Sequence, residues 1–493
     1  MASTYATFSN SYARLPQHFY SRLNPTPVPQ PRLVAFNEAL AQELGIDTGA
    51  VDTTVLAAIH GGNLVPPGAE PIAMAYAGHQ FGGFVPQLGD GRAILLGEVL
   101  DRQGRRRDIQ LKGSGRTPYS RRGDGRAALG PVLREYLVSE AMHALGVPTT
   151  RSLAAVLSGE FVVREQRLPG AIFTRVAASH IRVGTFQFLS ARGEDASIRL
   201  LAQYAIERHY PDTGADQRPA LALLQEASRR QAELVARWMM VGFVHGVMNT
   251  DNTAISGETI DFGPCAFLEA YDPETVFSSI DSHGRYAFGN QPQAARWNIA
   301  RLAETLVPVI DPDTGRATEL AQAVIDEFPA HFERAWIGGM RAKLGLALEE
   351  EGDFDLANGL LECMRLNQAD FTLTFRRLCD AAADPAGAIG PREQFADPGA
   401  YDAWAQKWHQ RLQREPATRQ ERAARMRRCN PAFIPRNHRV EQAIEAATQH
   451  GDTTRFLDLL RVVANPYDEQ PESADLRNAA QPAERVLRTF CGT

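Results

Sequence analysis

The chain has 493 residues, of which 44% are hydrophobic and 22% are charged, and its formal net charge is −6. This composition is that of a globular protein large enough for more than one domain, and the acidic balance argues against a nucleic-acid partner. No run of roughly 18 apolar residues predicts a membrane-spanning helix, and the N-terminus lacks the apolar core of a secretory signal.

The cysteines favour a reducing, cytoplasmic setting. Without a predicted membrane-spanning helix, we expect no membrane partner. There are five, and none belongs to a CxxC pair: Cys265, Cys363, Cys379, Cys429 and Cys491. Five scattered thiols in so long a chain predict neither a disulfide scaffold nor a zinc site. Cys491 stands out because it lies close to the end of the chain.

The first part of the chain reads mostly as strands and turns. Residues 32–44 are an exception, because apolar residues spaced for one helical face precede Gly45 and predict a helix. Residues 93–99 and 107–112 predict strands, and residues 129–145 have helical spacing. Residues 152–164 predict a hairpin that turns at Ser158-Gly159.

From about residue 195 the chain becomes helical. Residues 221–243 predict a long amphipathic helix, and helices dominate again from residue 294. Between them, residues 253–261 predict a tight hairpin around Gly257-Glu258. A strand-rich half followed by a helix-rich half predicts an α+β protein with two lobes, and clefts between lobes are preferred ligand sites.

Several residues of the strand-rich half suit phosphate groups. Gly89, Gly91 and Arg92 lie just before a predicted strand, where glycines allow close backbone approach. Lys112 ends the next strand, and Glu135 in the following helix is its natural partner. Taken singly, the glycine segment would be an ordinary turn, Lys112 a surface lysine and Glu135 a solvated helix acid.

A basic loop follows Lys112 directly. Residues 113–126 hold four glycines and four arginines, and they include Asp124 and Gly125. Arginines match the roughly four negative charges of a triphosphate bidentately. Arg175 and Arg182 are further candidates, and Lys112 and Arg175 are expected to be cleft groups that contribute little to the core. A flexible basic surface loop is the alternative interpretation of residues 113–126.

The most specific pattern lies downstream. Asp251 and Asn252 follow a long predicted helix, and Asp261-Phe262-Gly263 comes shortly after them. In protein kinases a catalytic-loop Asp and Asn precede Asp-Phe-Gly, and the hard oxygen ligands hold Mg²⁺ against the phosphates. The ordered set predicts a kinase-like site. His-Arg-Asp and Ala-Pro-Glu are absent, and Asp251 directly precedes Asn252, so protein-kinase chemistry is not assured.

Motifs along nearly the whole chain resemble those of the selenoprotein O family of protein adenylyltransferases. They are SYARLP (11–16), YAGHQFG (76–82), QLGDGRA (87–93), LKGSGRTPYSR (111–121), HGVMNTDN (245–252), IDFGPCAF (260–267) and NPAFIPRNHRVE (430–441). The resemblance implies a two-lobed, protein-kinase-like (pseudokinase) fold. It also implies transfer of AMP from ATP, or UMP from UTP, to Ser, Thr or Tyr hydroxyls of protein substrates, with Mg²⁺ or Mn²⁺.

The resemblance also implies a role for each matching residue. Asp251 would be the general base, Asn252 and Asp261 would bind the metal, and Glu135 would position Lys112. The nucleotide, bound with Asp261 and its metal, would be held by Gly89, Gly91, Arg92, Lys112, Asp124, Gly125, Arg175 and Arg182. A cysteine near the C-terminus is a family feature, and Cys491 occupies that place. A redox pair of Cys491 with Cys265, which lies two residues after Asp-Phe-Gly, is one interpretation, and two unrelated thiols is the other.

These expectations divide the chain into four parts. Residues 1–69 would be an N-terminal extension packed on the kinase-like core, and residues 70–190 the nucleotide-binding, strand-rich N-lobe. Residues 191–480 would be the helical C-lobe with the catalytic and metal residues, and 481–493 a tail with Cys491. We expect a monomer. Two other functions stay open: a kinase that moves the γ-phosphate, and a nucleotide-binding scaffold without catalysis.

Overall fold

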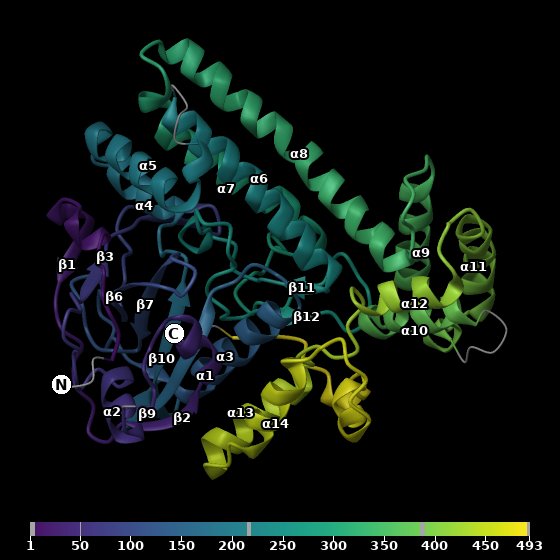
Figure 1. The fold of residues 1–493 in the computed structure, drawn as a ribbon, viewed down its shortest axis with the longest axis horizontal. Helices are drawn as coiled ribbons and strands as arrows, with labels where there is room; N and C mark the ends of the chain where they lie inside the picture. Colours follow the sequence, from purple (N-terminus) through teal and green to yellow (C-terminus); the bar gives the residue numbers. More distant parts are fainter. Residues whose placement is uncertain (1–4, 50, 214–217, 385–389, 491–493) are drawn as a thin grey trace.

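The computed structural model describes residues 5–49, 51–213, 218–384 and 390–490. They form a strand-rich part and a helical part (Figure 1). Cys491 lies outside the described residues. Among those described, no helix combines the length and the apolar character needed to cross a membrane.

The strand-rich part is built on one antiparallel sheet with the order β1-β3-β6-β7-β10-β9-β2, to which β8 adds by pairing with β10. Its strands are β1 (Tyr20–Arg22), β2 (Arg32–Phe36), β3 (Ile72–Met74), β6 (Ala93–Leu100), β7 (Arg106–Lys112), β8 (Ala127–Ala128), β9 (Arg151–Val163) and β10 (Arg167–Ala177). Both edge strands, β1 and β2, come from the first 69 residues. The strands predicted at 93–99 and 107–112 are confirmed as β6 and β7. Their register places Ala93 opposite Lys112.

Three helices and a small hairpin complete this part. They are α1 (Glu38–Glu43), α2 (Thr53–His60), α3 (Leu129–Ala144) and the strands β4 (Gly78–Gln80) and β5 (Gly83–Val85). Helix α3 confirms the helix predicted at 129–145. It packs on the sheet through an apolar cluster that includes Leu133, Tyr136 and Phe173.

The helix predicted over residues 32–44 is wrong in its first half. Arg32–Phe36 forms β2, which pairs with β9 at the sheet edge, and only Glu38–Glu43 is helical. The side chain of Asn37 accepts a hydrogen bond from Leu40 N at 3.0 Å, so the helix begins after Asn37. Apolar spacing alone did not reveal that β9 offers these residues a strand partner.

The two predicted hairpins are also corrected. Strand β9 runs through Ser158-Gly159 without turning, and its hairpin partner is β10, which begins at Arg167. Residues 253–256 and 259–261 do not pair with each other. Ala254 instead forms a bridge with Arg182, and Thr259 forms one with Thr149. Long-range partners replace the local pairing in both places.

The helical part contains α4 (Val183–Ser190), α5 (Asp195–His209), α6 (Pro219–Met240), α7 (Gln291–Ile310), α8 (Thr314–Leu344), α9 (Asp353–Asn367), α10 (Phe371–Ala383), α11 (Pro398–Leu412) and α12 (Arg419–Arg427). Helix α6 confirms the long helix predicted at 221–243, and α8 runs along the outside of α6 and α7 (Figure 1). The short strands β11 (Phe243–Val244) and β12 (Ala266–Phe267) pair with each other in the segment that connects α6 to α7. The last helices, α13 (Asn437–His450) and α14 (Thr454–Val463), return to pack on α3.

Candidate functional site

A cavity of about 580 Å³ lies where the glycine turn, the basic loop and the segment after α6 meet. Seven of the predicted site residues line it: Gly89, Gly91, Arg92, Asp124, Gly125, Asp251 and Asp261. The lining holds six arginines, namely Arg92, Arg116, Arg121, Arg122, Arg126 and Arg164. So many guanidinium groups around one cavity suit a polyanionic ligand.

An ion-pair network connects the sheet, α3 and the Asp-Phe-Gly segment. Lys112 Nζ at the end of β7 donates to Glu135 Oε2 at 2.6 Å and to Asp261 Oδ1 at 3.0 Å. Glu135 Oε1 accepts from Arg175 Nε at 3.0 Å. The sequence placed these four residues in one site, and the structure brings them into contact.

The network is more buried than the sequence suggested. Arg175 lies in β10 with 3% of its surface exposed, and its guanidinium also contacts Gln110. It is therefore part of the core of the sheet, and the expectation that it contributes little there is wrong. Asp251 and Asp261 line the cavity, whereas five other predicted site residues do not: Lys112, Glu135, Arg175, Arg182 and Asn252.

Asp261 has an unusual backbone and a strongly acidic side chain. Its φ of 68° lies in the left-handed region, which Asp and Asn tolerate better than most residues. Burial by itself would raise the pKa of this carboxyl. Lys112, Arg175 and Arg92 outweigh burial and hold the pKa far below its ordinary range. Asp261 is thus a carboxylate at any physiological pH.

Asp251 lies in the short 3-10 helix η4 (Thr250–Asn252), beside β4. Gln80 Nε2 donates to its Oδ2 at 3.0 Å, whereas its Oδ1 is buried without a hydrogen-bond partner among the described residues. Arg182 Nη1 donates to the Asp251 carbonyl at 3.2 Å. Burial raises the pKa of Asp251 to about 6, although the Gln80 amide opposes the shift.

The side chain of Asn252 uses its amide nitrogen for a hydrogen bond within the protein, and its amide oxygen is available for a ligand. Its Nδ2 donates to the Val247 carbonyl at 3.0 Å. This bond assigns the amide nitrogen to the backbone, so the side-chain oxygen is the atom left to act as a ligand.

The basic loop is closed by an ion pair and by glycine. Asp124 accepts two bonds from Arg164, at 2.8 and 3.1 Å, which ties the loop to the tip of the β9–β10 hairpin. Gly125 has a φ of 71°, and a Cβ there would lie 2.2 Å from the Gly115 carbonyl carbon. Only glycine therefore fits at this crossing of the loop on itself. Asp124 is engaged by Arg164 as well as lining the cavity.

Sequence reasoning missed several residues of the cavity wall, and those with polar side chains include Tyr76, Gln80 and Arg164. Tyr76 lies under the Arg182 guanidinium, which is 4.3 Å from its ring centre. Gln80 and Asp251 are 171 positions apart in the chain, so no local spacing connects them. The YAGHQFG motif was the available signal, but the resemblance assigned it no chemistry.

Cys265 is a buried cysteine near the site, and it has no disulfide partner among the described residues. It is 0% exposed, and burial raises the pKa of its thiol to about 12. The C-terminal segment contacts Pro264, the residue before Cys265, because the Thr489 hydroxyl donates to the Pro264 carbonyl. Thr489 N also donates to the Phe277 carbonyl at 2.8 Å.

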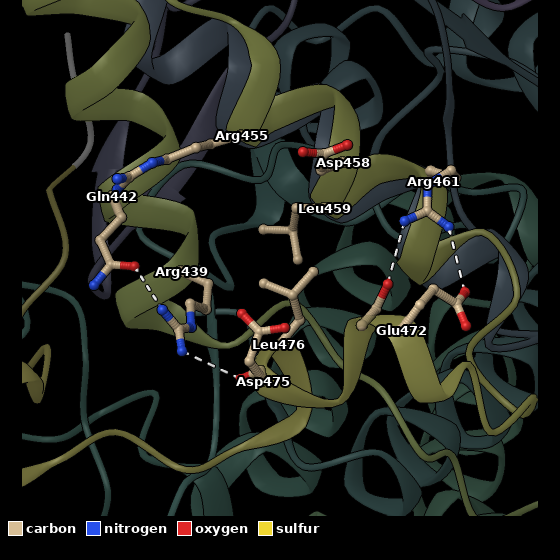
Figure 2. A pocket seen from close by; sticks show the side chains of 10 residues that line it. Arg439, Gln442, Arg455, Asp458, Leu459, Arg461, Glu472, Asp475 and Leu476 are labelled. Carbon is tan, nitrogen blue, oxygen red and sulfur yellow. Dashed lines mark hydrogen bonds and ion pairs between the residues drawn. The ribbon is translucent and has the colours of Figure 1, made fainter.

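A second polar cavity, of about 590 Å³, lies between α13, α14 and residues Pro471–Arg477 (Figure 2). Its three arginines face three acids: Arg439, Arg455 and Arg461 against Asp458, Glu472 and Asp475. Arg439 already donates to Gln442 at 3.1 Å, and Arg461 to Ser473 at 3.2 Å. The balanced charge makes this cavity a poor competitor for a nucleotide.

A cationic cavity with three carboxylates on its wall and a buried Lys–Glu pair beside it is typical of an enzyme that acts on nucleotide phosphates. A family model described as "Protein adenylyltransferase SelO" matches residues 3–464. The chain therefore belongs to the SelO family of protein adenylyltransferases.

Similar proteins cover the chain almost completely. "Protein nucleotidyltransferase YdiU" of Rhizobium meliloti (strain 1021) is 62% identical over 486 residues, with 99% of both chains covered. The proteins of the same name from Agrobacterium fabrum and Bradyrhizobium diazoefficiens are 62% and 60% identical, again over 99% of both chains.

Proposed function

We propose that the chain transfers AMP from ATP, and UMP from UTP, to Ser, Thr or Tyr hydroxyls of proteins in a kinase-like cleft between two lobes. The single observation that supports this best is the Lys112–Glu135–Asp261 network beside the arginine-lined cavity. The network joins Lys112 and Glu135, in the proposed N-lobe of residues 70–190, to Asp261, in the proposed C-lobe of residues 191–480. Residues 1–69 and 481–493 are the extension and the tail in this division.

In this proposal the cations hold the phosphates. Gly89, Gly91 and Arg92 with Asp124 and Gly125 form the nucleotide-facing wall. Lys112, Arg175 and Arg182 supply positive charge from behind the wall. When an acceptor oxygen attacks the α-phosphorus, pyrophosphate leaves, and fixed cations stabilise its developing charge.

The donors of Asn252 and Asp261 fit a hard divalent cation, Mg²⁺ or Mn²⁺. Within residues 5–49, 51–213, 218–384 and 390–490, no cluster of three or more His, Cys, Asp or Glu could hold a metal by itself. Mg²⁺ is commonly bound by one or two carboxylates plus substrate phosphates. The metal would neutralise phosphate charge, while Asp251 accepts the proton of the attacking hydroxyl.

Labelled nucleotides test the transfer. The purified chain is incubated with Mg²⁺ or Mn²⁺, casein as a hydroxyl-rich acceptor, and ATP labelled at either the α- or the γ-phosphate. Adenylyl transfer predicts protein-bound label from α-labelled ATP only, and α-labelled UTP tests uridylyl transfer. Label from γ-labelled ATP would instead show a kinase. No label in the acceptor or the chain itself, with either metal, would show a scaffold.

Cys265 and Cys491 are proposed as a redox pair on the same site. Thr489, two residues before Cys491, is bonded to Pro264, the neighbour of Cys265. A peroxide oxidant would take two electrons and two protons from the thiols and form one disulfide. Because the Cys265 thiol is buried, the segment must open locally before it reacts.

A further inference from the structure

The small β4–β5 hairpin reaches across to the segment that carries Asp251. We propose that Gln80, on β4, is a positioning residue that orients the Asp251 carboxylate towards the acceptor hydroxyl. The inference rests on the proposed role of Asp251 as general base. It adds a residue that neither the sequence motifs nor the similar proteins' names assign to the reaction.

Three successive residues of the hairpin contact three successive residues of the loop before and at η4. His79 N donates to Thr250 Oγ1 at 2.7 Å, and Phe81 N donates to Asn249 Oδ1 at 3.0 Å. Between them, Gln80 Nε2 donates to Asp251 Oδ2 at 3.0 Å. The two backbone bonds fix the hairpin against the loop, so the Gln80 side chain meets the carboxylate at a defined place.

The chemistry of this bond decides which oxygen remains free. An ionised carboxylate only accepts hydrogen bonds, so the amide must present its NH₂ group to Oδ2. Oδ1 has no partner among the described residues, although it is buried and Asp251 lines the cavity. An unpartnered buried oxygen is costly unless a ligand satisfies it. Oδ1 packs against Gly78, so this contact and the Gln80 bond to Oδ2 together define the orientation of the carboxylate.

Glycine makes this close approach sterically possible. A Cβ on Gly78 would lie 2.6 Å from Asp251 Oδ1, well inside contact distance. Any other residue at 78 would therefore push the carboxylate away from its present orientation. Arg182 Nη1 also donates to the Asp251 carbonyl at 3.2 Å.

A second layer of bonds stiffens the contact. Thr250 Oγ1 donates to Gln187 Oε1 at 2.6 Å, and Gln187 Nε2 lies 2.8 Å from His79 Nδ1. The hairpin, α4 and the loop thus share one polar network. Its order leaves the carboxylate little freedom to rotate, which is what alignment of a base with its proton requires.

In the reaction, the acceptor O–H proton moves to the Asp251 carboxylate while the oxygen bonds to the α-phosphorus and pyrophosphate leaves. Gln80 exchanges no proton. It holds Oδ2 by a hydrogen bond and so limits rotation of the carboxylate. Its removal should therefore lower kcat and leave nucleotide affinity unchanged.

The test uses the full chain, Mn²⁺ and α-labelled ATP with casein. Gln80→Ala is expected to lower kcat by on the order of 10-fold to 10²-fold, a fraction of what a general base contributes. The KM and the binding constant for ATP, and the urea midpoint, should stay within about twofold of the parent values. Gln80→Glu keeps the shape without the donor, and its kcat should be at least as low.

Gln87→Ala is the matched control, because Gln87 is exposed and its Oε1 accepts one long hydrogen bond, from Arg192 at 3.5 Å, within the part of the chain that the structure describes. It should match the parent chain in every measurement. A near-parental kcat for Gln80→Ala or Gln80→Glu would overturn the inference. So would a parallel loss of ATP affinity or folding, which would mark Gln80 as merely structural. If Asp251→Ala itself keeps the parental kcat, the general base is wrong and the inference fails with it.

Discussion

Replacing Glu135 by Gln tests the energetics of the buried network. The Glu135 side chain is 5% exposed and accepts bonds from Lys112 at 2.6 Å and from Arg175 at 3.0 Å. The amide keeps the shape but removes the carboxylate that is bonded to Arg175 among the described residues, and Arg175 is itself 3% exposed. Uncompensated buried charge of this kind costs about 3–5 kcal/mol of unfolding free energy.

The expected thermal shift is small because the chain is long. An unfolding entropy of about 2.1 cal/mol/K per residue gives about 1 kcal/mol/K for the whole chain. The melting temperature should therefore fall by only about 3–5 °C if the chain unfolds in one transition. Urea unfolding followed by tryptophan fluorescence measures the free energy more directly.

The control is Glu233→Gln, which removes an exposed ion pair with Arg229 whose side chains are both 38% exposed. This change should cost less than about 1 kcal/mol. If Glu135→Gln loses no more stability than Glu233→Gln, the buried network does not support the fold, and the reasoning from burial is refuted.

Burial alone would raise the pKa of Glu135, but Arg175 and Lys112 lower this pKa below the ordinary 4.5. The stability that Glu135 adds should therefore be complete above pH 4.5 and be lost as the pH falls below it. The urea midpoints of the parent and Glu135→Gln should converge in acid. Lys112→Ala should lower the rate of adenylyl transfer on the order of 10²-fold. The urea midpoint should change little, because the ion pair between Glu135 and Arg175 remains. A parental rate would show that Lys112 does not act in the site. Asp261→Asn should abolish metal-stimulated transfer yet fold, since Asn tolerates the φ of 68°, and metal titration of its activity checks this. Peroxide-treated chain should yield a Cys265–Cys491 peptide in non-reducing mapping, absent in Cys265→Ser; two free thiols in the treated parent would end that proposal.

Local sequence determined the chemistry and several elements. Alternation predicted β6 and β7, helical spacing predicted α3 and α6, and the ordered motifs put Lys112, Glu135 and Asp261 in one site. These features depend on neighbours in the chain or on a motif order that is itself sequence. They could therefore be read without knowing how distant segments meet.

Tertiary structure decided what depends on distant partners. Residues Arg32–Phe36 have helical spacing but became a strand because β9 offered its edge. Arg175 was expected in the cleft and instead lies in the sheet core, where Glu135 balances its charge. Gln80 reaches Asp251 only because β4 folds onto η4, 171 positions away. A side chain's burial and partners are set by packing across the whole chain, and no local pattern encodes them.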